Sequence, residues 1–287
     1  MSDWLADEAV AETVRRALAE DVGSGDATTL ALVSETARRR ATILARHPVT
    51  VAGGPVAALC FRETDPSLAC ETLVPDGGRA EAGQALFTVR GSARAILTAE
   101  RTALNFMQRL TGIATLTRRF VAVAGRYGVA ILDTRKTTPG LRALEKYAVS
   151  CGGGENHRQG LYDRILIKDN HRALWSGGEG RRLADAVRHC RQAFPGLTIE
   201  IEVENEAELT DALDGAPDWI LLDNMAPDAL RRCVELCAGR SRLEASGGIA
   251  LDNVEAYART GVNAISLGCL THSAAAADLS LEIEKEA

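Results

Sequence analysis

Hydrophobic and polar positions follow different periods in different parts of this chain. Residues 7–20 predict a first helix, because apolar side chains recur there every three or four positions before glycines end the pattern. Residues 39–94 instead contain short β-like runs separated by Gly, Pro and Asp clusters, which predicts a small α+β domain. A long helical pattern follows over residues 93–109.

Beyond residue 111 helical segments alternate with short β-rich runs. The six runs are VAILD (129–133), RILIK (164–168), TIEIEVE (198–204), DWILLD (218–223), RLEAS (242–246) and NAISLG (263–268). Helical patterns occupy residues 112–127, 179–193, 206–213, 227–237 and 252–260. This alternation is typical of βαβ units, so the fold class is predicted to be α/β with a parallel sheet.

Each run ends in chemically active residues. In chain order these are Thr134-Arg135-Lys136, Lys168 to His171, the alternating Glu200, Glu202 and Glu204, Asp223-Asn224, Ser246-Gly247-Gly248 and Gly268. Polar groups at the carboxyl ends of successive strands, with glycine loops after the last two, are typical of the active-site face of a β/α barrel. A doubly wound sheet would carry a glycine fingerprint after its first strand, and the sequence has none there.

Composition and charge narrow the class of protein. The 287 residues are 46% hydrophobic and 25% charged, which excludes a disordered chain. A net charge of −6 argues against nonspecific nucleic-acid binding. We expect no membrane span and no signal peptide, because the longest charge-free apolar stretch, residues 47–61, is short and broken by Gly and Pro, and the first residues are acidic. Seven scattered cysteines without a CxxC pair predict a reducing, cytoplasmic location.

Two basic segments are candidates for anion binding. TRKTTPG (134–140) is either a solvated loop or a site in which Arg135 pairs with a carboxylate and Lys136 with a phosphate. CGGGENHR (151–158) is either a flexible turn or a place where glycine backbone approaches a ligand beside His157 and Arg158. Lys168 is a candidate Schiff-base lysine or anion ligand.

Acidic residues suggest a cation or a polyhydroxyl group. Glu200, Glu202 and Glu204 share one face of a strand, and Asp223 ends the next. Three acids inside a barrel repel one another unless they bind a cation or accept hydrogen bonds, which favours a Mg²⁺-bearing or polyhydroxyl substrate. The histidines, among them His47, His189 and His272, are too dispersed to predict a zinc site, and Cys233 and Cys237 are interpreted as packed thiols one helical turn apart.

Six stretches together resemble one family over nearly the whole chain. They are residues 100–117, 133–171, 199–209, 221–225, 244–249 and 268–281, joined by EDVGSGDATT (20–29). These long, specific motifs are similar to those of quinolinate phosphoribosyltransferase (decarboxylating), also called nicotinate-nucleotide pyrophosphorylase.

The resemblance implies an architecture and an assembly. Residues 1–110 would form an N-terminal α/β sandwich domain, with the tail 272–287 packing back on it, and residues 111–271 an incomplete, seven-stranded β/α barrel. The family assembles as a homodimer or a hexamer (trimer of dimers), and the resemblance implies that one subunit's N-terminal domain caps its partner's barrel. Arg101 would then enter the partner's site.

The resemblance also implies a reaction and site residues. Quinolinate and 5-phosphoribosyl 1-diphosphate would give nicotinate mononucleotide, pyrophosphate and CO₂ in NAD biosynthesis, with Mg²⁺ and without an organic cofactor. Mg²⁺ would arrive with the donor, with Glu202 and Asp223 as its candidate ligands; these two residues, Lys136 and Lys168 are the candidate catalytic residues. The residues implied around quinolinate are Arg101, Thr134, Arg135, His157, Arg158 and Lys168. Those implied around the donor are Lys136, Glu202, Asp223, Ser246, Gly247, Gly248 and Gly268.

Three rival interpretations remain at this point. A related phosphoribosyltransferase associated with molybdenum uptake shares the overall pattern, but we expect it to lack the intact LIKDNH (166–171). A Schiff-base aldolase would use Lys168 and would be trapped by borohydride with a carbonyl substrate. A catalytically silent binding barrel would not need all of the strand-end groups.

Overall fold

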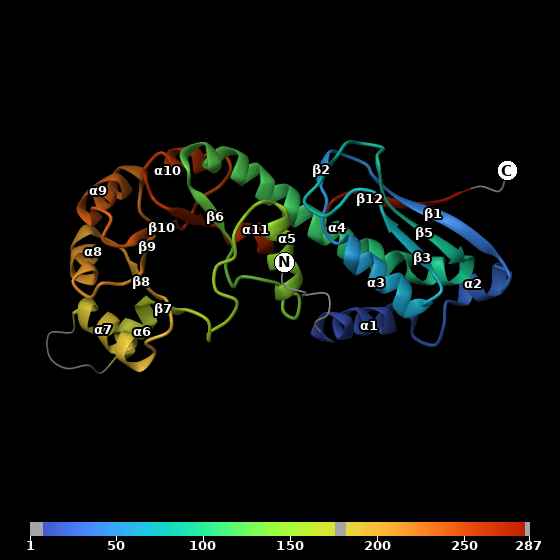
Figure 1. Cartoon of the computed structure of the whole chain (residues 1–287), viewed down its shortest axis with the longest axis horizontal. Helices are drawn as coiled ribbons and strands as arrows, with labels where there is room; N and C mark the ends of the chain where they lie inside the picture. Colours follow the sequence, from blue (N-terminus) through green and yellow to red (C-terminus); the bar gives the residue numbers. More distant parts are fainter. Residues whose placement is uncertain (1–7, 176–181, 285–287) are drawn as a thin grey trace. The chain divides into compact units, whose positions relative to one another are not determined.

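The computed structural model describes residues 8–175 and 182–284, which form two compact units (Figure 1). Unit 1 contains the described residues up to 118, residues 137–153 and those from 270 onwards. Unit 2 contains residues 119–136 and the described residues between 154 and 269. The expected α+β organisation of the N-terminal part and the parallel α/β organisation of the second part are both present.

An antiparallel sheet forms the centre of unit 1. Its strand order is β12-β1-β5-β3. The strands are β1 (Arg38–Ala45), β3 (Ala69–Thr72), β5 (Ala85–Ser92) and β12 (Leu279–Ile283), and a separate pair consists of β2 (Val49–Thr50) and β4 (Arg79–Ala80). The pairing of β12 with β1 ties the end of the described chain to its beginning, with Ala41 opposite Ile283.

Helices complete unit 1. They are α1 (Glu8–Val22), α2 (Ala27–Leu32), α3 (Gly54–Thr64), α5 (Arg142–Cys151) and the first part of α4 (Ala93–Ala124). The predicted first helix is therefore confirmed over residues 8–20, while residue 7 lies outside the described residues. The core includes the stacked rings of Phe61 and Phe87, whose centroids are 6.0 Å apart.

One correction concerns α4, which runs without interruption where the sequence suggested two helical segments, 93–109 and 112–127. Gly112 lies inside the helix and does not end it. A Cβ at this position would come within 2.0 Å of the carbonyl oxygen of Ala275. The glycine therefore permits close packing of the chain near residue 275 against the helix.

A six-stranded parallel sheet forms unit 2, and its strands coincide with the six runs read from the sequence. They are β6 (Ala130–Leu132), β7 (Ile165–Ile167), β8 (Ile199–Val203), β9 (Trp219–Asp223), β10 (Arg242–Ser246) and β11 (Ala264–Ser266). The order is β6-β11-β10-β9-β8-β7, and neighbouring strands are parallel throughout.

A single bridge takes the place of the seventh strand that the family resemblance implied. Glu155 pairs in parallel with Leu132 of β6. The main-chain N–H of Glu155 donates to Ile131 (2.8 Å), and that of Asp133 donates back to Glu155 (3.2 Å). The described sheet thus has six strands, with residue 155 added on the far side of β6 from β11.

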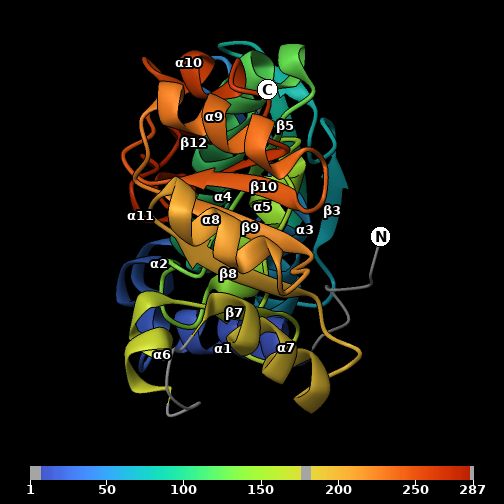
Figure 2. The ribbon, with the colours of Figure 1, turned by 90° about the vertical axis from the view of Figure 1, so that its left-hand side faces the viewer.

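The helices of unit 2 lie against one another on one face of this sheet (Figure 2). They are α7 (Leu183–Ala193), α8 (Glu206–Leu213), α9 (Pro227–Cys237) and α10 (Val254–Ala258), with α6 (Asp169–Leu174) after β7. After β11 comes α11 (Cys269–His272), whose residues from 270 onwards belong to unit 1. The predicted bounds of α8 and α9 are confirmed; the expected helix over residues 179–193 begins in residues 176–181, outside the described part.

Two compositional expectations concern the whole fold. Among the described residues, no helix is both long and apolar enough to cross a membrane. All seven cysteines are free thiols, and Cys233 and Cys237 are buried as expected. Burial raises the pKa of the Cys233 thiol to about 11.

Candidate functional site

The predicted strand-end residues of unit 2 gather at one edge of its sheet, because all six strands are parallel. The acidic residues Glu202 and Asp223 end the neighbouring strands β8 and β9. The basic residues follow β6, the bridge at Glu155, and β7. The basic residues therefore follow the strands at the two ends of the strand order, β6 with its bridge and β7. The acidic residues and the glycine loops come from the strands between them.

Two guanidinium groups, those of Arg135 and Arg158, lie close enough to perturb each other. Burial, followed by the charge of Arg135, lowers the pKa of Arg158 below its ordinary value. The Nε of Arg135 is buried, and no hydrogen-bond partner for it is found among the described residues. A buried donor without a partner costs free energy, so two adjacent cations of this kind indicate a site for an anion.

His157 is buried and makes hydrogen bonds through its backbone and both ring nitrogens. Its backbone N–H donates to Oδ1 of Asp133 (2.9 Å). Its Nδ1 accepts from the backbone N–H of Arg158 (2.7 Å), and its Nε2 lies 2.8 Å from Oε2 of Glu200. The ring therefore belongs to a hydrogen-bonded group within the protein.

Lys168 and Glu202 form an ion pair. Nζ of Lys168, the residue after β7, lies 2.8 Å from Oε2 of Glu202 on β8. Glu202 is 8% exposed, whereas the side chain of Lys168 is half-exposed, so the ammonium also faces solvent. A Schiff-base lysine must have its amine available to a carbonyl substrate, whereas this Nζ is engaged by the Glu202 carboxylate.

The three predicted carboxylates of the β8 region do not behave alike. Glu200 and Glu202 are buried on β8, as the alternating pattern predicted. Glu204 lies beyond the end of the strand and is exposed, so the expectation of three acids inside the barrel is wrong for this residue. The strand ends at Val203 and the chain turns into α8, which takes residue 204 out of the alternation.

Asp223 and Gly247 lie in two adjacent strand-end turns. Asp223 is opposite Ser246 in the β9–β10 register. Asn224 adopts a left-handed conformation (φ 54°), and its amide donates to Oδ2 of Asp223 (2.7 Å). Gly247 (φ 97°) must be a glycine, because a Cβ there would come within 2.1 Å of Oδ1 of Asn224.

The remaining predicted residues of this edge lie in turns. Oγ1 of Thr134 accepts the backbone N–H of Lys136 (3.0 Å), which bends the chain directly after β6. Gly248 has a positive φ of 64° and open space around its Cα, so its backbone is accessible. Gly268 follows β11 and is half-buried.

Arg101 belongs to unit 1, unlike the other predicted site residues. It lies on α4, and its side chain is 61% exposed. Its Nη2 lies 3.9 Å from Oε1 of Glu100, which makes a long ion pair. A long, exposed guanidinium of this kind is free to meet an anion that comes from outside its own unit.

The triple glycine has a structural role at two of its positions. A Cβ on Gly152 would come within 2.5 Å of Thr117 on α4, so Gly152 allows α5 to pack closely on that helix. Gly153 has a positive φ of 86° just after α5. Close approach of backbone to protein, rather than to a ligand, explains these two glycines.

Sequence reasoning missed three residues that surround His157. These are Asp133, Arg164 and Glu244, each within hydrogen-bond or ion-pair distance of His157. Glu244 lies in the run RLEAS. An acidic residue inside a predicted strand was the signal that could have identified it. In the described residues, His157, Glu200 and Glu244 also form the one group whose atoms lie close enough together to hold a metal ion.

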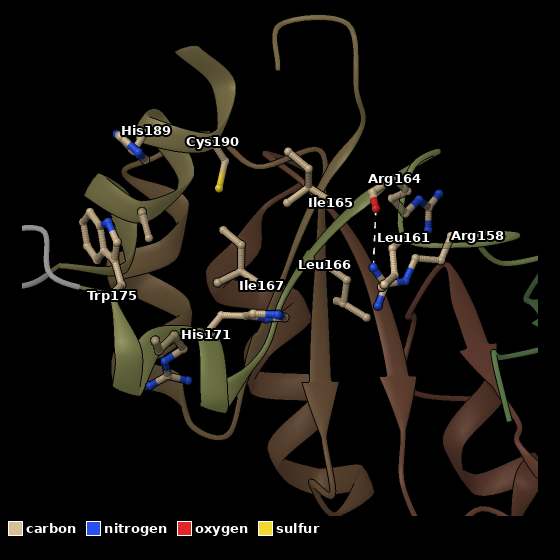
Figure 3. A pocket seen from close by; sticks show the side chains of 12 residues that line it. Arg158, Leu161, Arg164, Ile165, Leu166, Ile167, His171, Trp175, His189 and Cys190 are labelled. Atoms are coloured by element: carbon tan, nitrogen blue, oxygen red, sulfur yellow. Dashed lines mark hydrogen bonds between the residues drawn. The ribbon is translucent and has the colours of Figure 1, made fainter. Parts of the chain in front are cut away.

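A cavity of about 290 Å³ lies along β7 (Figure 3). Its lining comes mainly from β7, α6 and α7, with Trp175 and His189 on one side and Arg158 on the other. Nη1 of Arg158 donates to the carbonyl oxygen of Arg164 (3.5 Å) there. Among its lining residues, Arg158 alone belongs to the predicted site, so this apolar cavity lies beside the strand-end cluster.

Comparison with known proteins identifies the family. Residues 26–111 match the family model of the quinolinate phosphoribosyl transferase N-terminal domain, and residues 113–282 match that of its C-terminal domain. The chain is 42% identical over 282 residues to a nicotinate-nucleotide pyrophosphorylase [carboxylating] of Mycobacterium leprae, covering 96% of this chain and 98% of that protein.

Two further relatives agree. A quinolinate phosphoribosyltransferase [decarboxylating] of Nicotiana tabacum is 40% identical over 291 residues, which cover 96% of this chain and 82% of that protein. The structure of the nicotinate-nucleotide pyrophosphorylase from Francisella tularensis superposes with a TM-score of 0.90 at 37% identity, covering 96% of each chain. Both domain matches and these relatives show that this chain belongs to the quinolinate phosphoribosyl transferase family.

Proposed function

We propose that this chain transfers the phosphoribosyl group of 5-phosphoribosyl 1-diphosphate to quinolinate and releases CO₂, giving nicotinate mononucleotide and pyrophosphate. Family membership supports the reaction. The observation that carries the assignment to this chain's own residues is a pair of adjacent guanidiniums. Arg158 is buried, and Arg135 is half-buried with an Nε that has no hydrogen-bond partner among the described residues.

The cations suit a dicarboxylate. Quinolinate has two adjacent carboxylates, and a planar guanidinium pairs with a carboxylate through two parallel N–H groups. Arg135 and Arg158 provide such donors, and Lys168 adds a mobile point charge. Thr134, in the turn before Arg135, contributes a hydroxyl to the same region.

The central turns suit the phosphoribosyl donor. Gly247 and Gly248 both have positive φ values, which leaves main-chain N–H groups accessible to a phosphate after β10. Ser246, Gly268 and Lys136 flank this region from the ends of β10, β11 and β6. Glu202 and Asp223 are then available to hold ribose hydroxyls.

The chemistry requires stabilisation of charge at the anomeric carbon. The bond between this carbon and the pyrophosphate oxygen breaks, and the quinolinate nitrogen supplies the electron pair of the new C–N bond. Glu202 and Asp223 are negative groups at the ends of adjacent strands, so they stabilise the positive charge that develops during transfer. The carboxylate beside the nitrogen then leaves as CO₂ without an organic cofactor. The electron pair of the broken C–C bond stays on the ring carbon, where the adjacent pyridinium nitrogen stabilises it until this carbon takes up a proton from solvent.

The donor set at this edge fits Mg²⁺, which prefers oxygen ligands and retains several waters. Asp223 is half-buried at a strand end and is the better candidate ligand, because Glu202 is already engaged by the Lys168 ammonium. When bound with the diphosphate, Mg²⁺ would neutralise charge on the leaving group.

We also propose that the enzyme works in the cytoplasm as a homodimer or a hexamer (trimer of dimers) with shared sites. The exposed side chain of Arg101 on α4 supports this proposal, since it is not consumed by a close ion pair in its own unit. In such an assembly Arg101 supplies a further cation to a partner's quinolinate.

The direct test is an assay of the purified chain with Mg²⁺, quinolinate and the phosphoribosyl donor. We expect nicotinate mononucleotide, and one CO₂ released from the carboxyl beside the ring nitrogen for each pyrophosphate. Lys168→Met should abolish most of this turnover, whereas Arg119→Ala, at an exposed position on α4, should leave it unchanged. Absence of the nucleotide product with folded protein would overturn the proposal, and borohydride trapping at Lys168 would favour the aldolase.

A further inference from the structure

A group of buried polar side chains in unit 2, made of His157, Glu200 and Glu244, has no role assigned in the transfer itself. Glu200 on β8 and Glu244 on β10 are both 0% exposed. Each lies within 3.6 Å of Nε2 of His157, at 2.8 Å for Glu200 and 3.6 Å for Glu244. Arg164 approaches Oε2 of Glu200 at 3.4 Å.

The hydrogen bonds fix the tautomer of His157. Its Nδ1 accepts the backbone N–H of Arg158 and therefore carries no proton. Its Nε2 carries the ring proton and donates it to Glu200. The ring is neutral, and neither nitrogen is left to bind a substrate carboxylate in this arrangement.

The charges then determine the state of the two acids. Arg164 balances the charge of Glu200. Once His157 is neutral, no cation among the described residues lies within ion-pair distance of Glu244. An isolated buried carboxylate is strongly disfavoured, so Glu244 is protonated and able to donate to the otherwise unpartnered Oε1 of Glu200. Burial and the charge of Glu200 raise the pKa of Glu244 well above its ordinary value, against the effect of Ser266. Burial would raise the pKa of Glu200, but the hydrogen bond and the electrostatic attraction of His157, followed by the charge of Arg164, hold it below its ordinary value.

A metal ion is the alternative occupant of the same group. Its three residues are close enough together to be ligands. However, His157 would have to coordinate a metal ion through Nε2, and Nη1 of Arg164 lies only 3.5 Å from this atom. The metal ion and the guanidinium would then repel each other. A proton satisfies the same oxygens without placing two positive groups together.

From this geometry we infer that Glu200 and a protonated Glu244 are positioning residues: they hold neutral His157 so that its Nδ1 fixes the main chain of Arg158 and aims the Arg158 guanidinium at the substrate. The guanidinium of Arg158 also donates a hydrogen bond to the carbonyl oxygen of Arg164, which holds the far end of the side chain (Figure 3). The inference deepens the proposed function and depends on it only for the identity of the substrate.

The first experiment reads the tautomer directly and needs no activity. The ¹⁵N spectrum of histidine-labelled protein distinguishes a ring protonated on Nε2 from one protonated on Nδ1 and from the imidazolium. The His157 resonances are assigned by their loss in His157→Gln. We expect an Nε2–H tautomer at pH 7, whereas an imidazolium or an Nδ1–H tautomer overturns the inference.

The second experiment uses a matched pair of variants. In Glu200→Gln the amide oxygen accepts from His157 and the amide N–H donates to the carbonyl oxygen of Glu244, which stays protonated, so the contacts to His157 and to Glu244 both survive. Glu200→Leu removes the acceptor. We expect KM for quinolinate to rise by about tenfold or more in the Leu variant and by less than about threefold in the Gln variant, with KM for the phosphoribosyl donor almost unchanged in both.

The outcomes separate the possibilities. Equal increases in both KM values, or equal effects of Gln and Leu, indicate a merely structural role and overturn the inference. A stoichiometric transition metal in the purified protein, measured by mass spectrometry and absent from Glu244→Gln, also overturns it. If the wild type makes no nicotinate mononucleotide, the proposed function fails, while the tautomer measurement still decides the arrangement around His157.

Discussion

Nζ of Lys168 lies 2.8 Å from Oε2 of Glu202, and this ion pair joins the proposed binding regions of the two substrates. A carboxylate of quinolinate that binds Lys168 competes with Glu202 for the same ammonium. Release of Glu202 then makes its carboxylate available beside the ribose. The two proposed substrates are therefore expected to influence each other's binding through this pair.

The first prediction follows for Glu202→Gln. The amide keeps the shape of the side chain but loses the charge proposed to stabilise the transition state, so kcat should fall by about 10²-fold or more. Steady-state kinetics with both substrates varied measures this. Glu235→Gln, at an exposed position on α9, is the matched control and should behave like the wild type. Unchanged turnover of the Glu202 variant would contradict the assignment.

Asp223→Asn provides the second prediction. Loss of the proposed Mg²⁺-facing carboxylate should lower kcat by about 10²-fold and raise the Mg²⁺ concentration needed for half-maximal rate. Titration of the rate with Mg²⁺ measures both quantities. The exposed Asp228→Asn serves as control. A variant that keeps the wild-type Mg²⁺ dependence would remove Asp223 from the proposed site.

Substrate choice is the third prediction. Nicotinate lacks the second carboxylate and leaves buried cations unpaired, which costs roughly 1–3 kcal/mol for each charged hydrogen bond lost. We expect kcat/KM for quinolinate to exceed that for nicotinate by about 10²-fold. Competition between the two acids, followed by chromatography, measures the ratio. Comparable use of nicotinate would show that the cations do not read both carboxylates.

Complementation between subunits is the fourth prediction. If Arg101 serves a partner's site, mixing inactive Arg101→Ala with inactive Lys168→Ala should restore part of the activity, because some heterodimers contain one intact composite site. Subunit exchange is verified by mass spectrometry of differently tagged chains, and each variant alone is the control. Verified exchange without recovery would mean that Arg101 acts within its own chain.

The parallel sheet could be predicted from the sequence because its strands are short apolar runs, each followed by polar residues. All six runs became strands, and the helices over residues 206–213 and 227–237 were placed correctly, since their apolar faces repeat cleanly. The interruption expected between residues 109 and 112 was wrong, because the helix continues through Gly112, where close packing against Ala275 requires a glycine.

The acidic cluster around His157 shows what sequence alone does not reveal. Glu200, His157 and Glu244 come from three separate segments, and only the curvature of the sheet brings them together. Glu145 was missed for a similar reason: its partner Arg109 lies 36 positions away in the sequence, on α4. The roles assigned to individual site residues still rest on the family resemblance, and they stay predictions.

The fifth prediction concerns stability through Glu145 and Arg109. Glu145 is fully buried and accepts hydrogen bonds from Arg109 (2.8 Å) and from the hydroxyl of Thr138 (2.8 Å). Arg109→Ala leaves the buried carboxylate without its cation, so the free energy of unfolding should fall by about 3 kcal/mol. Urea denaturation measures the change, and Arg119→Ala should alter it by less than about 0.5 kcal/mol. A loss no larger than that of the control would show that the ion pair is not important for stability.

The single bridge at Glu155 has a consequence for the dynamics of the main chain. In a full strand, amide protons are protected from exchange with solvent by the ladder itself. Past this bridge, the amides of His157 and Arg158 are instead held by side chains, those of Asp133 and His157. Protection of these two amides from hydrogen exchange therefore depends on single side chains. Substitution of Asp133 or His157 would increase the mobility of the main chain that carries Arg158, the proposed substrate cation.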